Sequence, residues 1–282
     1  MMRHAAALVA VTLLTVAGCA NTEATDPAST EPDASVMGHI HGLGVDPADG
    51  VLYAATHFGL FRIVDGEATR VADRWQDTMA FTVVGEGNFL GSGHPDVRED
   101  LPVHLGLIES TDAGESWEAL ALQGEADFHA LEPAGDLLYA SDALTGSLMV
   151  TKDNRTFQTI TKIDAVDLAA DPSDPNHVLV TTPQGALASI EAASGQQETL
   201  AAPPLVFVDW FEPDLLVGLG PSGAIHISQD GAETWTEAAT VPGQAAAIEI
   251  TATAWYAATT QGLFSSVDRG SSWAPIQFGA IE

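Results

Sequence analysis

The chain has 282 residues, with 39 acidic side chains against 9 basic ones and a formal net charge of −30 at pH 7. A surface this acidic repels phosphate backbones, so we expect no nucleic-acid partner. The single cysteine excludes a disulfide within the chain.

The first predicted element is a signal peptide over residues 1–18. A short segment with Arg3 precedes an apolar run from Ala5 to Val16, which is shorter than the roughly 20 residues of a membrane-spanning helix. A Val-Ala-Gly sequence then leads into Cys19. This ending resembles the lipobox of bacterial lipoproteins. The resemblance implies that Cys19 is lipidated and anchors the protein to the membrane on its extracytoplasmic side.

A tether is predicted next. Residues 20–36 are rich in Ala, Thr, Pro, Asp and Glu and show no apolar periodicity, which is typical of a flexible segment. Together with the lipidated Cys19 they form a linker over residues 19–36. Residues 37–282 remain, and they are numerous enough for a single large domain.

A repeat of roughly 40 residues organises this domain. The segment 51–61 recurs almost unchanged as 255–264, and weaker copies lie at 89–94, 138–141, 178–185 and 216–220. The spacing is that of four-stranded propeller blades, which predicts an all-β, six-bladed β-propeller of antiparallel blades; seven blades is the alternative. The repeat units begin near His39, Met79, Asp127, Ala165, Val206 and Ala247.

A second motif, Ser-x-Asp-x-Gly-x-Ser/Thr-Trp, falls at the predicted turn between the third and fourth strands. It is complete from Ser110 and from Ser266, has Ala232 in place of Gly in the copy from Ser228, and is degraded at 151–157. The motif resembles the Asp-box, or BNR repeat, of sialidase-like and photosystem-assembly-factor-like propellers. Its carboxylate can accept hydrogen bonds within its own turn, so we interpret it as structural. The residues concerned are Ser110, Asp112, Gly114, Trp117, Asp230, Trp235, Asp268, Gly270 and Trp273.

A wider resemblance covers most of residues 38–273. The segments 39–44, 92–95 and 127–131 are similar to a group of uncharacterised bacterial lipoproteins that carry a BNR propeller and are labelled glycosyl hydrolase-like. That label follows from the fold, so the resemblance implies an architecture and no particular activity.

A sialidase would need three arginines around the substrate carboxylate and a tyrosine nucleophile. No arginine is expected at the start of an inner strand, because Arg62 and Arg70 fall on outer strands and Arg155 and Arg269 fall in hairpin turns. The tyrosines recur at one repeat position, as packing residues do: Tyr53, Tyr139 and Tyr256. We therefore lean against an enzyme, although a glycosidase that uses a pair of carboxylates stays open.

Histidines converge on one end of the predicted channel. His39 and His41 share one strand face, because side chains at i and i+2 point the same way. His57 and His94 hold matched positions in second-to-third-strand loops, and a lengthened loop, 95–104, brings Asp96 and His104 to the same mouth. Alignment of the inner strands places one polar or sulfur-containing residue of each blade at similar depth: His41, Met79, His129, Asp167, Asp209 and Glu249. His177 and His226 lie elsewhere, and we take them as structural.

These residues predict a metal site whose ligands are His39, His41, His57, Met79, His94, Asp127 and His129. Imidazole, carboxylate and thioether groups suit copper, zinc, iron or nickel, and Met79 favours copper. Two other interpretations stay open: a hydrogen-bonded girdle that binds only water, and a pocket for an organic ligand or for catalysis.

The sequence thus predicts an extracytoplasmic, lipid-anchored propeller that holds a transition metal or a protein partner at the channel mouth. The alternative is an extracytoplasmic glycosidase-like hydrolase that uses carboxylates at the same mouth.

Overall fold

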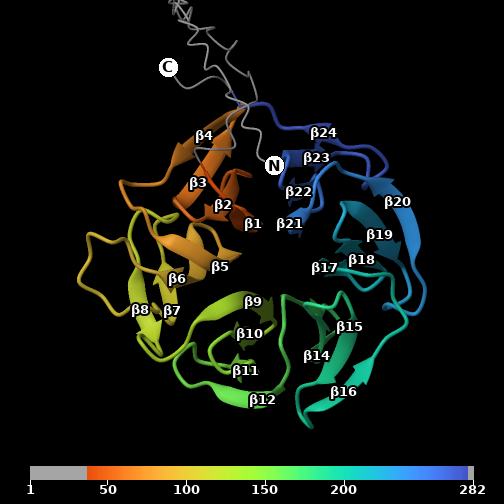
Figure 1. Cartoon of the computed structure of the whole chain (residues 1–282), viewed down its shortest axis with the longest axis horizontal. Helices are drawn as coiled ribbons and strands as arrows, with labels where there is room; N and C mark the ends of the chain where they lie inside the picture. The colour runs from red at the N-terminus through yellow and green to blue at the C-terminus, as the bar shows by residue number, and fades with distance from the viewer. Residues whose placement is uncertain (1–36, 279–282) are drawn as a thin grey trace, which may run out of the picture. The chain divides into compact units, whose positions relative to one another are not determined.

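Six four-stranded antiparallel sheets form a ring around a central channel in the computed structural model, which describes residues 37–278 (Figure 1). The predicted signal peptide, Cys19, the tether and residues 279–282 lie outside the described residues. Within residues 37–278, no helix is long and apolar enough to cross a membrane. The six-bladed propeller is confirmed.

Each blade uses four consecutive strands, ordered from the channel to the rim. The first two blades are β1 (Ile40–Val45), β2 (Leu52–Thr56), β3 (Gly59–Val64), β4 (Glu67–Arg70), β5 (Asp77–Gly85), β6 (Asn88–His94), β7 (Leu107–Ser110) and β8 (Glu118–Ala121). The third and fourth are β9 (Phe128–Ala134), β10 (Leu137–Asp142), β11 (Ser147–Thr151), β12 (Gln158–Lys162), β13 (Asp167–Asp171), β14 (Asp174–Thr181), β15 (Leu187–Glu191) and β16 (Gln196–Thr199). The last two are β17 (Phe207–Glu212), β18 (Leu215–Leu219), β19 (Ala224–Ser228), β20 (Thr236–Thr240), β21 (Ala245–Ile250), β22 (Trp255–Thr259), β23 (Gly262–Ser266) and β24 (Ala274–Pro275). Every inner strand begins within two residues of its predicted start.

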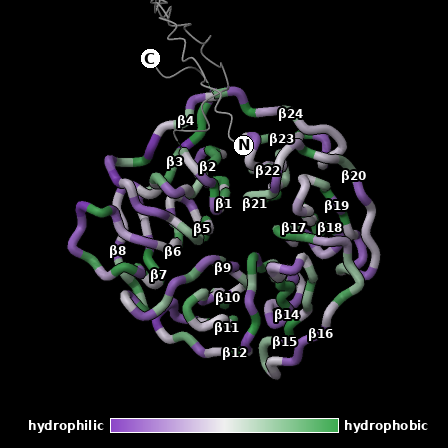
Figure 2. The backbone as a smooth tube through the Cα atoms, viewed as in Figure 1, coloured by the Kyte–Doolittle hydropathy of each residue, from purple (hydrophilic) through white to green (hydrophobic). Residues whose placement is uncertain are grey.

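The apolar core is divided into six clusters, and each cluster fills the interface between two neighbouring blades. Between the first two blades, for example, Tyr53 packs with Phe81 and Phe89. The second strands lie between neighbours on both faces, so β2 and β18 are buried at every position. This explains why these strands read as continuous runs of apolar and small residues instead of alternating. In Figure 2, hydrophilic residues are concentrated toward the outer rim.

The ring closes through side chains, because β21–β24 supply all four strands of the last blade. Met37 and Ile40 pack with Ala246 and Leu263 across the closing interface. Past β24, the Ile276 amide donates to the Leu263 carbonyl at 2.8 Å. Ile276 and Phe278 also pack against the cluster that joins the first blade to the sixth.

The Asp-box turns share one hydrogen-bond pattern. In the second blade, Asp112 accepts hydrogen bonds from the Ser116 amide at 2.9 Å and from the Ser116 hydroxyl at 2.6 Å. Asp230 and Asp268 accept the equivalent pairs from Thr234 and Ser272. These bonds hold the pKa of all three carboxyls below the ordinary value. The contacts fit the structural interpretation of these turns.

The three Asp-box tryptophans, Trp117, Trp235 and Trp273, are half-buried. Trp117 lies beside Gly91 and Trp235 beside Gly218, where an added Cβ would come within 3.2 Å of either ring. Glycine on the second strand thus makes the space that each indole occupies.

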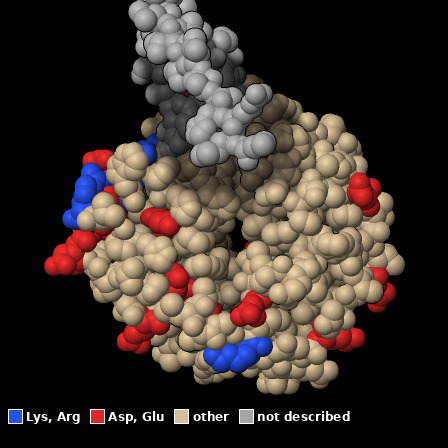
Figure 3. All heavy atoms as spheres, in the orientation of Figure 1, with Lys and Arg blue, Asp and Glu red and all other residues tan. Residues whose placement is uncertain are grey.

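On the face shown in Figure 3, acidic side chains are spread around the rim, and basic side chains gather at a few places. The distribution agrees with the chain's excess of carboxylates.

Candidate metal centres

All the predicted histidine ligands lie at one end of the propeller. In each blade the first strand begins, and the second strand ends, at the same end, because neighbouring strands are antiparallel. His41 and His129 are near the starts of β1 and β9, His57 follows β2, and His94 ends β6. The Asp-box turns follow third strands and therefore lie at the opposite end.

The structure divides these histidines into two groups. The first cluster consists of His39, His41, His57 and Asp77. The Nε2 atom of His41 lies 3.2 Å from His57 Nδ1, and Asp77 Oδ1 lies 3.3 Å from the former and 2.9 Å from the latter. His39 contacts the other ring nitrogen of His41, with 3.4 Å between the two Nδ1 atoms.

Burial and neighbouring charges both shift the pKa values of the first cluster. Burial alone would raise the pKa of Asp77, but the nearby His41 and His57 imidazoles outweigh it and the pKa is lowered. Burial, reinforced by the other two imidazoles, lowers the pKa of His39. The cluster thus favours an ionised carboxylate beside a neutral His39 near pH 7.

The second cluster consists of His94, His104, Asp127 and His129. His129 Nε2 lies 3.2 Å from Asp127 Oδ2, and His104 Nδ1 lies 3.6 Å from the same oxygen. The rings of His94 and His104 have centroids 5.4 Å apart. Residues 95–106 connect β6 to β7 and include the predicted long loop, 95–104, which brings His104 back beside His94.

Asp77 is the residue that sequence reasoning missed. Met79, proposed as a soft ligand, is half-buried at an irregularity of the β5–β6 pairing, and Asp77, two residues earlier, makes the contacts with the histidines. Asp77 stands two residues before Met79, as Asp127 stands two residues before His129, and this matched position in the repeat could have found it. Asp96, expected at the same mouth, stabilises the loop instead: it is buried and accepts hydrogen bonds from the Trp75 and Arg98 amides at 2.9 Å each.

The two other histidines of residues 37–278 lie elsewhere. His177 Nε2 is 2.8 Å from the Ser189 hydroxyl, and its Nδ1 is 3.5 Å from Asp171. His226 lies on β19, and burial lowers its pKa.

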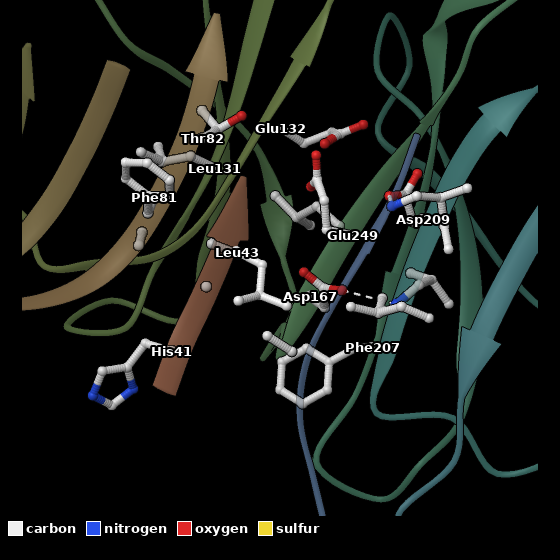
Figure 4. Close-up of a pocket in the computed structure, with 18 of the residues that line it drawn as sticks. His41, Leu43, Phe81, Thr82, Leu131, Glu132, Asp167, Phe207, Asp209 and Glu249 are labelled. Atoms are coloured by element: carbon white, nitrogen blue, oxygen red, sulfur yellow. Dashed lines mark hydrogen bonds between the residues drawn. The ribbon is translucent and has the colours of Figure 1, made fainter. Parts of the chain in front are cut away.

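Four carboxylates project into the central channel, which has a volume of about 390 Å³ (Figure 4). Glu132, Asp167, Asp209 and Glu249 come from four successive inner strands, and the His41 imidazole lies apart from them in this view. The first three accept hydrogen bonds from Ala170, Val208 and Ile250 amides at 3.0, 2.8 and 2.7 Å. Each of these bonds joins one blade to the next around the ring.

Burial in the channel raises the pKa of all four carboxyl groups. Burial raises the pKa of Asp167 and of Asp209 to about 7. Burial, together with neighbouring carboxylates, raises the pKa of Glu132 and Glu249 well above the ordinary value. Asp167, Asp209 and Glu249 were expected at the depth of His41; Glu132 was not anticipated.

No protein-family model matches the sequence, and no curated protein matches it. Solved structures do. A gluconolactonase from Xanthomonas campestris superimposes with a TM-score of 0.67 at 13% identity, covering 81% of this chain and 86% of that one. A GH74 xyloglucanase from the same organism gives 0.62 at 16% identity, with 86% and 55% covered. YCF48 bound to a D1 peptide gives 0.53 at 17% identity, with 85% and 81% covered.

At these identities, the similarity establishes the β-propeller fold. Membership of an Asp-box, sialidase-like family remains a prediction from the sequence motif.

Proposed function

We propose that this protein is an extracytoplasmic, lipid-anchored propeller that binds a divalent transition-metal ion through His41, His57 and Asp77. The observation that carries the proposal is the triangle formed by His41 Nε2, His57 Nδ1 and Asp77 Oδ1, with sides of 3.2, 3.3 and 2.9 Å. Lipidation of Cys19 would hold the propeller at the membrane surface.

The triangle has the size of one face of a tetrahedral metal site. Bonds of about 2.0–2.1 Å at tetrahedral angles place neighbouring ligand atoms about 3.3–3.4 Å apart. To bind an ion, the three donor atoms would therefore move apart by only a few tenths of an ångström. His57 is 46% exposed, so the fourth position opens toward solvent.

The chemistry of the donor atoms also supports an ion. Asp77 Oδ1 is buried, and the nearest ring nitrogens are those of His57 at 2.9 Å and His41 at 3.3 Å. A metal ion would satisfy this oxygen and the two ring nitrogens together. Two nitrogens and one carboxylate oxygen suit zinc or cupric ion.

His39 supports the centre without joining the triangle. It contacts Nδ1 of His41, and the Nε2 atom of His41 faces His57 and Asp77. A partner on the second ring nitrogen fixes the orientation of a metal-binding histidine and selects its tautomer. The acidic surface of the chain would add to this by concentrating cations around the site.

Calorimetry on the purified full-length protein, stripped with a chelator and titrated with zinc or copper(II) sulfate, tests the proposal. Wild type should show a binding event at this centre that His41→Ala and Asp77→Asn each abolish. His226→Ala, which removes a histidine from the fifth blade, should bind as wild type does. Equal heats for wild type and Asp77→Asn with both metals would overturn the proposal and leave a protein partner as the occupant of this mouth.

A second candidate is the glycosidase-like hydrolase, and the channel carboxyls favour it. A carboxyl with a pKa of about 7, such as Asp167 or Asp209, suits a general acid at neutral pH. However, one oxygen of Asp167 and one of Asp209 each accept a hydrogen bond from a backbone amide of the next blade. Hydrolysis of aryl glycosides or of lactones that Asp209→Asn removes, without a loss of stability, would favour this function over metal binding.

A further inference from the structure

The second cluster contains a histidine, His94, whose tautomer is selected by a hydrogen bond to the backbone. His94 Nδ1 lies 2.8 Å from the backbone carbonyl of Val103. A carbonyl oxygen can only accept a hydrogen bond, so this nitrogen carries the proton and Nε2 of neutral His94 keeps a free lone pair. Histidines that bind metals through one nitrogen commonly donate the other N–H to a backbone carbonyl in this way.

Two further atoms of the second cluster lack partners. Asp127 Oδ1 and His104 Nδ1 are both buried and have no hydrogen bond among the described residues. The Asp127 side chain is only 9% exposed. Its other oxygen is engaged by His129 at 3.2 Å. Unsatisfied buried polar atoms are costly, and these two belong to side chains that approach to 3.6 Å, between His104 Nδ1 and Asp127 Oδ2.

The backbone around the second cluster is anchored on every side. The His104 carbonyl accepts the Gly124 amide at 2.8 Å, and the Leu105 amide donates to Gly93 at 2.9 Å. The Asp127 amide donates to Asp142 Oδ1 at 3.1 Å. One donor atom from each of His94, His104 and Asp127 lies within 4.8 Å of the others. Side-chain rotations that bring these donor atoms closer together would complete a site for one ion.

We propose that His94, His104 and Asp127 form a second transition-metal site, separate from the first cluster, with His129 positioning the Asp127 carboxylate. The ion would join both ends of the 95–106 loop to the third blade. Two imidazoles and a carboxylate make zinc or cupric ion the expected occupant. This site goes beyond the proposed function, because neither centre shares a ligand with the other.

The number of bound ions tests this site. Equilibrium dialysis of the full-length protein against zinc, followed by elemental analysis, should give two ions for wild type. His104→Gln and His94→Gln should each keep one ion, and Asp77→Asn should keep the other. The double variant Asp77→Asn with His104→Gln should keep none. His226→Ala serves as the matched control and should keep two.

The outcomes separate the two proposals. One ion that is lost in Asp77→Asn and kept in His104→Gln overturns the second site and leaves the first. One ion with the reverse behaviour overturns the first site and leaves the second. A folded wild type without zinc overturns both. As an independent readout, zinc should slow tryptic cleavage after Arg98, within the loop, in wild type but not in His104→Gln; equal protection in both would count against the second site.

Discussion

Asp77 and His94 are Cα partners in the pairing of β5 with β6, yet they belong to different histidine clusters. The Asp77 carboxylate contacts His41 and His57 of the first blade, whereas His94 lies beside His104 and the third blade. The inner hairpin of the second blade thus supplies one donor to each proposed centre. The two centres can be removed separately because each takes its remaining donors from a different neighbouring blade or loop.

We expect zinc to raise the thermal stability of the protein. An ion that binds only the folded chain adds about 2.7 kcal/mol at one hundred times its dissociation constant. Differential scanning calorimetry should show a rise in Tm for wild type and a smaller rise for Asp77→Asn. Asp136→Asn, which changes an exposed carboxylate of the third blade paired with Lys152, should respond as wild type does. An identical rise in wild type and Asp77→Asn would contradict a role for that carboxylate.

We expect Met79 to be dispensable for metal binding. Because Asp77, two residues earlier, makes the contacts with His41 and His57, Met79→Leu should change the zinc and copper(II) dissociation constants by less than about threefold. This volume-conserving change should cost less than about 1.5 kcal/mol of stability. A large and selective loss of copper affinity, measured by competition with a chromophoric chelator, would restore the thioether as a ligand.

Asp209 should make the protein less stable as the pH rises. Its pKa is raised to about 7, so between about pH 4 and pH 7 the folded protein holds a proton that the unfolded chain has lost. The free energy of unfolding therefore falls through this window. Asp209→Asn keeps an acceptor for the Ile250 amide and avoids the buried charge.

Urea denaturation should show Asp209→Asn to be more stable than wild type by roughly 2–4 kcal/mol at pH 8, since each pKa unit is worth about 1.4 kcal/mol. The difference should vanish near pH 4. A difference that stays constant with pH would show that titration of Asp209 is not its source. Asp136→Asn, at an exposed carboxylate, should show no such trend.

Gly114 should resist substitution because of both its conformation and its surroundings. It has φ +89°, and an added Cβ would lie 2.4 Å from Leu60 Cδ2. Gly114→Ala should cost about 1–3 kcal/mol in urea denaturation. The equivalent position of the fifth blade already holds Ala232 at φ +73°. Ala232→Gly should change stability by less than about 1 kcal/mol, because relief of strain offsets the lost methyl burial. Equal and small effects at both sites would contradict the steric argument.

Cys19 should determine where the protein resides. The apolar run and the Val-Ala-Gly sequence before it predict acylation of its thiol. Cys19→Ala should move the protein from the membrane fraction to the soluble extracytoplasmic fraction, as fractionation and immunoblotting would show. Cys19→Ser, which keeps a side chain of similar size but no thiol, should behave the same way. Retention of either variant in the membrane fraction would refute the lipid anchor.

The sequence by itself determined the architecture. Blade number, the starts of the inner strands and the Asp-box turns follow from local patterns that repeat about every 40 residues. His41 and His57 were also predicted to meet, because strand starts and second-to-third-strand loops share one end of a blade. These relations depend on antiparallel hairpins, whose partners are close in the sequence.

Only the tertiary structure decided how the histidines are grouped and which carboxylates join them. Asp77 reaches His41 across the interface of the first and second blades, and the long loop folds His104 back onto His94. Glu132 enters the channel and bonds to the fourth blade. The Asp77 and His104 contacts depend on how one blade packs against the next and on how a loop returns, whereas the Glu132 bond has counterparts at Asp167 and Asp209. Such contacts join residues that the repeat places in different units, so a single repeat does not encode them.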